Sequence, residues 1–193
     1  YLYLRQSYDM GSVVTLNTVF GYPVDITDRT QINTDQEFYG LSADLGTLWG
    51  GWDFNAFYIA QENAGISDRE AVGGELLYFD TSKSLFSLVD YDIGYDALNI
   101  FQLIGNWSVV DGTALNLVVD YRNSPILTTT NAIQGQGVEK FEELFGLFSE
   151  DELRQLAEDR TVASQSVTAG ITQQLNVNWQ FIGEVTVAEY GET

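Results

Sequence analysis

The sequence predicts an all-β fold, an antiparallel up-and-down transmembrane β-barrel with about ten strands in this chain. Two observations carry the prediction: apolar and polar residues alternate, and the alternating segments are long. Successive side chains of a strand point to opposite faces, so an alternating segment is apolar on one face only. In the segment 114–122 the apolar face comprises Leu115, Leu117, Val119 and Tyr121. The opposite face comprises Asn116, Asp120 and Arg122.

Two architectures contain long strands with one apolar face. In a soluble sandwich the apolar faces of two sheets meet. In an outer-membrane barrel the apolar face meets lipid and the polar face lines an interior. The expected strands run to about 9–11 residues, the length needed to cross a bilayer at a tilt, whereas soluble strands are usually nearer 5–6 residues. The length therefore favours the barrel.

Four expected strands occupy the first third of the chain. They are the segments 1–8, 13–21, 38–47 and 53–60. Paired glycines at positions 50 and 51 supply the positive φ that a tight turn needs. The segment 22–36 is polar and has no period, which is typical of a loop. A loop of medium length is expected at 62–70.

The remaining strands form a central group of four and a final pair. The central group comprises 71–80, 85–95, 101–108 and 114–122, and the final pair comprises 162–173 and 179–190. Short turns are expected at 81–84, 96–97, 111–112 and 175–178. One domain, 1–193, accounts for the whole pattern.

The segment 123–160 interrupts the series as a long insert with two expected helices, 138–145 and 150–159. Ser149 and Glu152 form a capping box, and Phe148 with Leu153 matches a hydrophobic staple. The apolar stripe comprises Phe141, Leu144, Phe145, Phe148, Leu153 and Leu156. Such a stripe suits a helix packed on a barrel rim as well as a gate that closes the lumen. Under the gate hypothesis Phe145, Phe148, Leu153 and Leu156 should be largely buried.

Aromatic residues gather at the ends of the expected strands. The tryptophans beside short turns are Trp49, Trp52, Trp107 and Trp179, and the tyrosines toward the opposite ends are Tyr58, Tyr91, Tyr121 and Tyr190. Bilayer interfaces select two such girdles, although aromatic residues also favour strands in general.

The polar face is expected to be acidic. Its charged residues comprise Asp44, Asp53, Glu75, Asp90, Asp92, Asp120 and Glu184, with Arg5 and Arg122 of opposite charge. A lumen with this balance would favour cations. The alternative is that these groups only hydrate the interior and pair locally.

Composition excludes several classes of function. The chain has 28 acidic and 8 basic residues and a formal net charge of −20, which opposes binding to nucleic acid. It has no His and no Cys, so Ser-His-Asp and Cys-His catalysis cannot be built from it. The acidic segment 25–28 lacks the spacing and glycine of an EF-hand. We expect no enzyme, no cofactor and no metal.

Several segments resemble a family of large proteobacterial outer-membrane proteins. The similar segments are 21–25, 38–42, 73–92, 124–129 and 152–161. The family has a periplasmic portion, often with helical repeats, followed by a many-stranded barrel. The resemblance implies that this chain is a middle segment of a larger barrel, and it supplies no catalytic residues. The family's layout is similar to that of exporters of bacterial exopolysaccharide.

The expected function is a pore or export channel in a bacterial outer membrane, with an acidic lumen and a gating loop. Its expected partners are outer-membrane lipid and periplasmic or outer-membrane proteins. Two alternatives stay open: a non-conducting scaffold or adhesin that binds a partner through its loops, and a soluble β-sandwich binding module.

Overall fold

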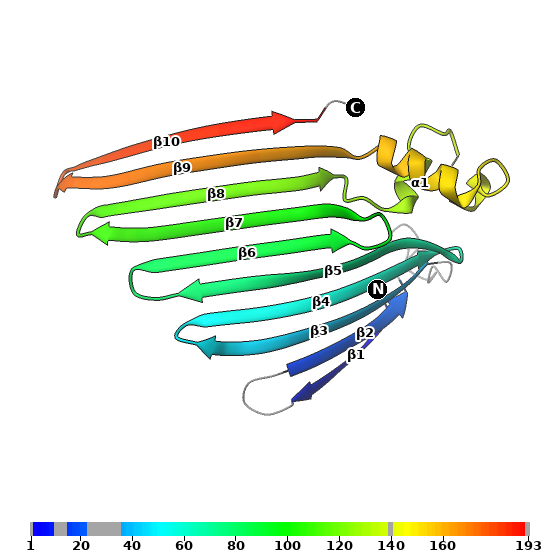
Figure 1. The fold of residues 1–193 in the computed structure, drawn as a ribbon, viewed down its shortest axis with the longest axis horizontal. Coiled ribbons are helices and arrows are strands. Elements are labelled where there is room, and N and C mark those ends of the chain that lie inside the picture. Colours follow the sequence, from blue (N-terminus) through cyan, green and yellow to red (C-terminus); the bar gives the residue numbers. More distant parts are fainter. Residues whose placement is uncertain (1, 10–14, 23–35, 139–140, 192–193) are drawn as a thin grey trace.

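The computed structural model describes residues 2–9, 15–22, 36–138 and 141–191. These residues form one antiparallel sheet with a small helical insert (Figure 1). The strands are β1 (Leu2–Asp9), β2 (Thr15–Tyr22), β3 (Gln36–Trp49), β4 (Trp52–Asn63), β5 (Ile66–Phe79), β6 (Lys83–Asp92), β7 (Ala97–Val110), β8 (Thr113–Ser124), β9 (Val162–Asn176) and β10 (Trp179–Tyr190). The predicted all-β architecture with ten strands is confirmed.

The strands pair in simple sequence order, from β1 to β10. β1 and β10 are the two edges, and no pairing joins them within the described residues, so the sheet is open. Closure into a transmembrane barrel stays a prediction. No helix among the described residues is long and apolar enough to cross a membrane.

Because every strand reverses direction, the connections alternate between two ends of the sheet (Figure 1). Turns after β3, β5, β7 and β9 lie at one end, which we call the tryptophan end because Trp52, Trp107 and Trp179 lie near it. Trp49 is the last residue of β3, at the same end. Turns after β4 and β6 and the insert after β8 lie at the opposite end, the insert end.

The observed register separates a polar face from an apolar face. Residues directly opposite in an antiparallel pair point to the same side of the sheet. One row of opposed residues comprises Ser84, Asn106, Asn116, Gly170 and Glu184. The adjacent row comprises Leu85, Gly105, Leu117, Ala169 and Val185. The two rows alternate as the sequence predicts.

The acidic residues predicted to share one face do so. A single row across the sheet comprises Asp44, Asn55, Glu75, Leu88, Gln102, Asp120 and Ser166. Asp53, Asp90 and Arg122 lie on the same face two residues from this row along their strands, and Asp92 lies four residues from it. Glu184 shares the face through the row of Asn116 and Gly170. Arg5 belongs to β1, whose side chains lie outside the part of the chain that the structure describes. The polar face also carries Phe57 and Ile104, so it is less uniform than expected.

The sheet is a single layer. Within the described residues the buried apolar side chains are Ala71 and a cluster in the insert, and no second sheet covers either face. Large apolar side chains are consequently exposed, such as Phe181 at 53% and Val187 at 70%.

The connection between β4 and β5 differs from the loop predicted at 62–70. β4 continues to Asn63 and β5 begins at Ile66, leaving Ala64 and Gly65 as a two-residue turn. Their φ angles are 51° and 79°, as a tight hairpin turn requires. The prediction of a loop was wrong because alternation in β5 extends five residues further than the apolar residues indicate. This extension places Arg69 within a strand.

The insert contains two short 3-10 helices, η1 (Thr129–Ile133) and η2 (Phe141–Leu144), and one α-helix, α1 (Glu150–Asp159). The helix predicted at 150–159 is confirmed with its boundaries. The helix predicted at 138–145 was too long, since only the single turn of η2 forms and residues 139–140 lie outside the described residues. Asn123 and Ser124 belong to β8 rather than to the insert.

Candidate functional site

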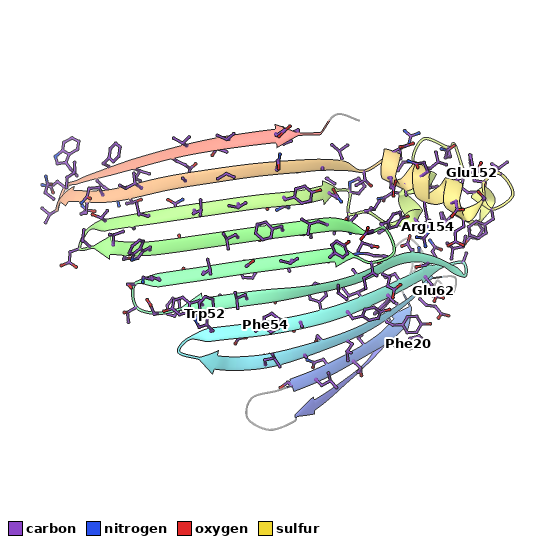
Figure 2. All side chains as sticks on the ribbon, in the orientation of Figure 1. Phe20, Trp52, Phe54, Glu62, Glu152 and Arg154 are labelled. Atoms are coloured by element: carbon purple, nitrogen blue, oxygen red, sulfur yellow. The ribbon has the colours of Figure 1, made fainter. Side chains whose placement is uncertain are left out.

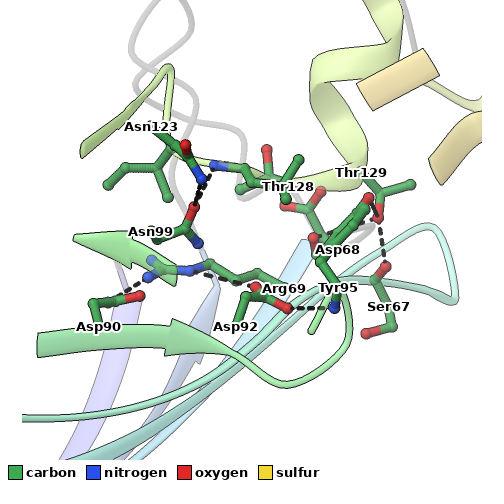
Figure 3. Close-up of polar contacts among 12 residues, drawn as sticks. Ser67, Asp68, Arg69, Asp90, Asp92, Tyr95, Asn99, Asn123, Thr128 and Thr129 are labelled. Carbon is green, nitrogen blue, oxygen red and sulfur yellow. Dashed lines mark hydrogen bonds and ion pairs between the residues drawn. The ribbon is translucent and has the colours of Figure 1, made fainter. Parts of the chain in front are cut away.

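The insert joins the sheet through a buried polar network at the insert end (Figure 3). We call the residues Arg69, Asp90, Asp92, Asn99 and Asn123 the polar anchor. The register explains why three of them meet on the polar face. Asp92 lies opposite Ala71, Asp90 lies opposite Gly73, and Arg69 is two residues before Ala71 on the same face of β5.

Arg69 pairs closely with one buried carboxylate and lies near a second. Its Nη2 donates to Asp90 Oδ2 at 2.5 Å, and its Nε lies 3.9 Å from Asp92 Oδ2. The exposed fractions of the side chains are 10% for Arg69, 7% for Asp90 and 0% for Asp92. Burying charges is costly unless they are paired, so the folded state needs the Arg69 guanidinium beside these carboxylates.

Asp92 also shapes the turn between β6 and β7. Its Oδ1 accepts the backbone N–H of Tyr95 at 2.9 Å. The Tyr95 hydroxyl in turn lies 2.8 Å from Thr129 Oγ1, and Thr129 donates to the Ser67 carbonyl at 2.9 Å. Burial raises the pKa of Tyr95 to about 12, so this phenol is neutral near pH 7. The turn is thereby bonded to both the sheet and η1.

Asn99 holds the start of the insert. The side chain of Asn123 and the backbone N–H of Leu127 both donate to Asn99 Oδ1 at 3.1 Å. Asn99 is fully buried, and it lies where the register between β6 and β7 shifts. Asn99 thus bonds both Asn123 at the end of β8 and Leu127 in the insert.

A second polar contact fixes η1 on β5. Asp68 Oδ1 accepts the backbone N–H of Thr130 at 2.7 Å and its hydroxyl at 2.6 Å. The Asn63 amide donates to the same hydroxyl at 3.1 Å. These bonds connect residues about sixty positions apart in sequence, so the insert is an ordered element with a defined seat.

An apolar cluster completes the contact. Its buried members are Leu127, Ala132, Phe141, Leu144, Leu153 and Ala157. Ile66 and Ala97 of the sheet and Tyr95 of the β6–β7 turn pack against them. Arg154 of α1 donates to the Gly94 carbonyl at 2.9 Å, and its guanidinium lies 5.4 Å from the centre of the Tyr95 ring. The side chain of Arg154 thus links α1 to the β6–β7 turn (Figure 2).

The residues predicted to form a gate helix have mixed outcomes. Ser149 caps α1, and the capping box with Glu152 is present; the backbone and hydroxyl of Ser149 donate to Glu152 and lower the pKa of that carboxyl. Leu153 is buried, and Phe148 and Leu156 are half-buried. The expectation for Phe145 was wrong: its ring is 36% exposed and packs edge-on against Phe141. With η2 reduced to one turn, Phe141 and Leu144 take the buried positions.

The residues predicted to line a lumen divide into two groups. Asp90 and Asp92 have the predicted face, but they are buried beside Arg69, so they are not accessible to solvent. Asp120 is paired with Arg122 and accepts a hydrogen bond from Gln102 at 3.0 Å. The remaining acidic residues have no ion pair among the described residues and stay accessible: Asp44, Asp53, Glu75 and Glu184.

The residues predicted to face lipid share the apolar face. Trp107 is opposite Leu115, Tyr91 is opposite Val72, and Tyr58 is opposite Leu41. Leu117, Val119 and Tyr121 continue along β8 on the same side. Tyr58 lies near the middle of β4 rather than toward its end, whereas Tyr91, Tyr121 and Tyr190 lie near the insert end.

Sequence reasoning missed Arg69, Asn99, Tyr95 and Thr129. The available signal for Arg69 was its spacing of two from Ala71, which continues the alternation of β5 toward its start. Among the described residues no group of three or more His, Cys, Asp or Glu side chains is arranged to hold a metal ion. No protein family, curated protein or solved structure matches the chain.

Proposed function

We propose that the chain forms part of the wall of an outer-membrane β-barrel that acts as a pore or export channel. The apolar face contacts lipid, the polar face borders an aqueous interior, and the insert covers part of one mouth. The observation that carries the proposal is the single layer of ten two-faced strands, whose apolar face has no protein cover within the described residues.

Strand length supports a membrane span. β3, β5 and β7 have 14 residues each, which at about 3.3 Å per residue gives about 46 Å. A tilt of about 45° reduces this to about 33 Å along the membrane normal, close to the ~30 Å hydrocarbon core of a bilayer. The aromatic residues at the tryptophan end suit an interface with headgroups.

The insert has the position of a partial cover. Its apolar residues pack on Tyr95 in the β6–β7 turn, and Thr129 of η1 bonds the hydroxyl of Tyr95, whose backbone N–H bonds Asp92 on the polar face. Short turns of outer-membrane barrels face the periplasm and longer loops face outward, so the insert end would lie outside.

A conductance measurement tests the proposal. The protein in planar bilayers should form cation-preferring channels, and Glu75→Gln with Asp53→Asn should reduce the ratio of cation to anion permeability. Glu189→Gln is the matched control, because Glu189 lies on the apolar face opposite Gln165. Removal of 138–159 should raise conductance. Absence of conductance in bilayers for every variant would contradict the channel and leave a scaffold role.

A further inference from the structure

The apolar face has a groove near the tryptophan end, with a volume of about 590 Å³. Gly105 forms its floor, and the nearest atom to a Cβ built there is Leu85 Cδ1 at 3.7 Å. The missing side chain thus leaves a shallow channel between the strands on either side. The walls include Leu85, Trp107, Leu117 and Ala169.

One cation lies at the mouth of this groove. Lys83 is exposed, and its Nζ lies 5.3 Å from the centre of the Trp107 ring. Lys83 makes no ion pair with any residue that the structure describes. The other cations whose side chains are described, Arg69, Arg122, Arg154 and Arg160, are instead at the insert end.

The carboxylate nearest to Lys83 in sequence, Asp80, is hydrogen-bonded within the β5–β6 turn. Asp80 accepts the Tyr78 hydroxyl at 2.6 Å and the backbone N–H groups of Ser82 and Lys83 at 2.6 and 2.7 Å. The Tyr78 hydroxyl and the Ser82 amide hold the pKa of Asp80 at about 2. The ammonium of Lys83 therefore keeps its charge available for a ligand, although the chain as a whole is strongly acidic.

We infer that this groove binds one phospholipid with an anionic headgroup, whose acyl chain lies over Gly105 and whose phosphate contacts the Lys83 ammonium beside Trp107. The inference rests on the proposed contact of the apolar face with lipid. An apolar channel ending in a single cation matches a molecule with a long apolar chain and one phosphate. Tryptophan favours the interface at headgroup depth, where the phosphate lies.

Brominated lipids test the inference, because bromine on an acyl chain quenches a nearby indole. The full protein with Trp49, Trp52 and Trp179 replaced by Phe reports on Trp107 alone. In vesicles of phosphatidylcholine, brominated phosphatidylglycerol should quench Trp107 at about fivefold lower mole fraction than brominated phosphatidylcholine, as one lysine at a membrane surface contributes about 1 kcal/mol. Lys83→Gln should abolish that preference, Lys83→Arg should keep it, and Gly105→Leu should weaken quenching by the bound lipid.

The outcomes separate this inference from the proposed function. Equal quenching by the two lipids, unchanged in Lys83→Gln, would overturn the specific site and leave the membrane wall intact. Protection of Trp107 from both lipids would contradict both proposals. If Trp107 is protected and a cysteine placed at Leu117 cross-links to a second copy, the groove is an interface between copies rather than a lipid site.

Discussion

Replacing Arg69 with Met is expected to destabilise the folded chain by about 3–5 kcal/mol, because the substitution leaves two buried carboxylates without a cation. Asp90 and Asp92 are 7% and 0% exposed in their side chains, and Arg69 is the only cation paired with them among the described residues. The methionine retains most of the volume, so the loss is one of charge more than of packing.

The matched control is Arg122→Met, which removes the same charge from an exposed pair. Arg122 is 51% exposed and its partner Asp120 is 17% exposed. Surface ion pairs contribute about 0–1 kcal/mol, so this variant should differ little from the parent. The contrast isolates burial, since the chemical change is the same at both sites.

Unfolding in guanidinium of protein reconstituted in vesicles, followed by tryptophan fluorescence, gives the free energy of unfolding of each of the two variants. Trypsin cleavage after Arg154 or Arg160 gives a local measure, because loss of the anchor should undock the insert. Adding Asp92→Asn to Arg69→Met should recover part of the loss. Equal effects of Arg69→Met and Arg122→Met, with unchanged proteolysis, would refute the buried anchor.

Three further predictions follow from single positions. Leu117→Arg should destabilise the inserted chain by about 2–4 kcal/mol, whereas Asn116→Arg on the opposite face should cost much less in the same unfolding assay; equal costs would contradict the assigned faces. Because the pKa of Glu152 is lowered in the folded chain, the capping box stabilises α1 at pH values above the ordinary carboxyl pKa, and this stabilisation is lost as pH falls through the lower folded pKa. Hydrogen exchange at the start of α1 should therefore accelerate in acid relative to exchange at its end. Glu152→Gln should remove this pH dependence. Ala64→Gly should raise stability by about 1 kcal/mol, because Ala64 has a φ of 51° and a left-handed conformation costs a residue with a Cβ about 1–2 kcal/mol; a destabilised variant would contradict the turn.

The strands and their faces could be predicted because alternation is a local property of the sequence. The row through Leu117 and the row through Asn116 follow from period two alone, and the register adds only which neighbours meet. The capping box at Ser149 is local in the same sense, since its two partners are three residues apart.

The anchor could not be predicted because it depends on contacts distant in sequence. Asn99 serves Leu127 across 28 positions, and Thr130 bonds Asp68 across 62. Phe145 illustrates the same limit: a helical stripe places it inward, but the insert forms only one turn there, and its exposure follows from tertiary packing.

A nitroxide scan along β8 tests the central claim, that one face of this sheet meets lipid and the other meets water. Labels at 115–119 in reconstituted protein are compared for collision with oxygen, which concentrates in lipid, and with a water-soluble nickel complex. The account predicts oxygen contact at Leu115, Leu117 and Val119 and nickel contact at Asn116 and Val118. Val118 is decisive, because it is apolar yet shares the face of Asp120. Nickel contact at Leu117, or protection of all five positions from both reagents, would contradict the claim.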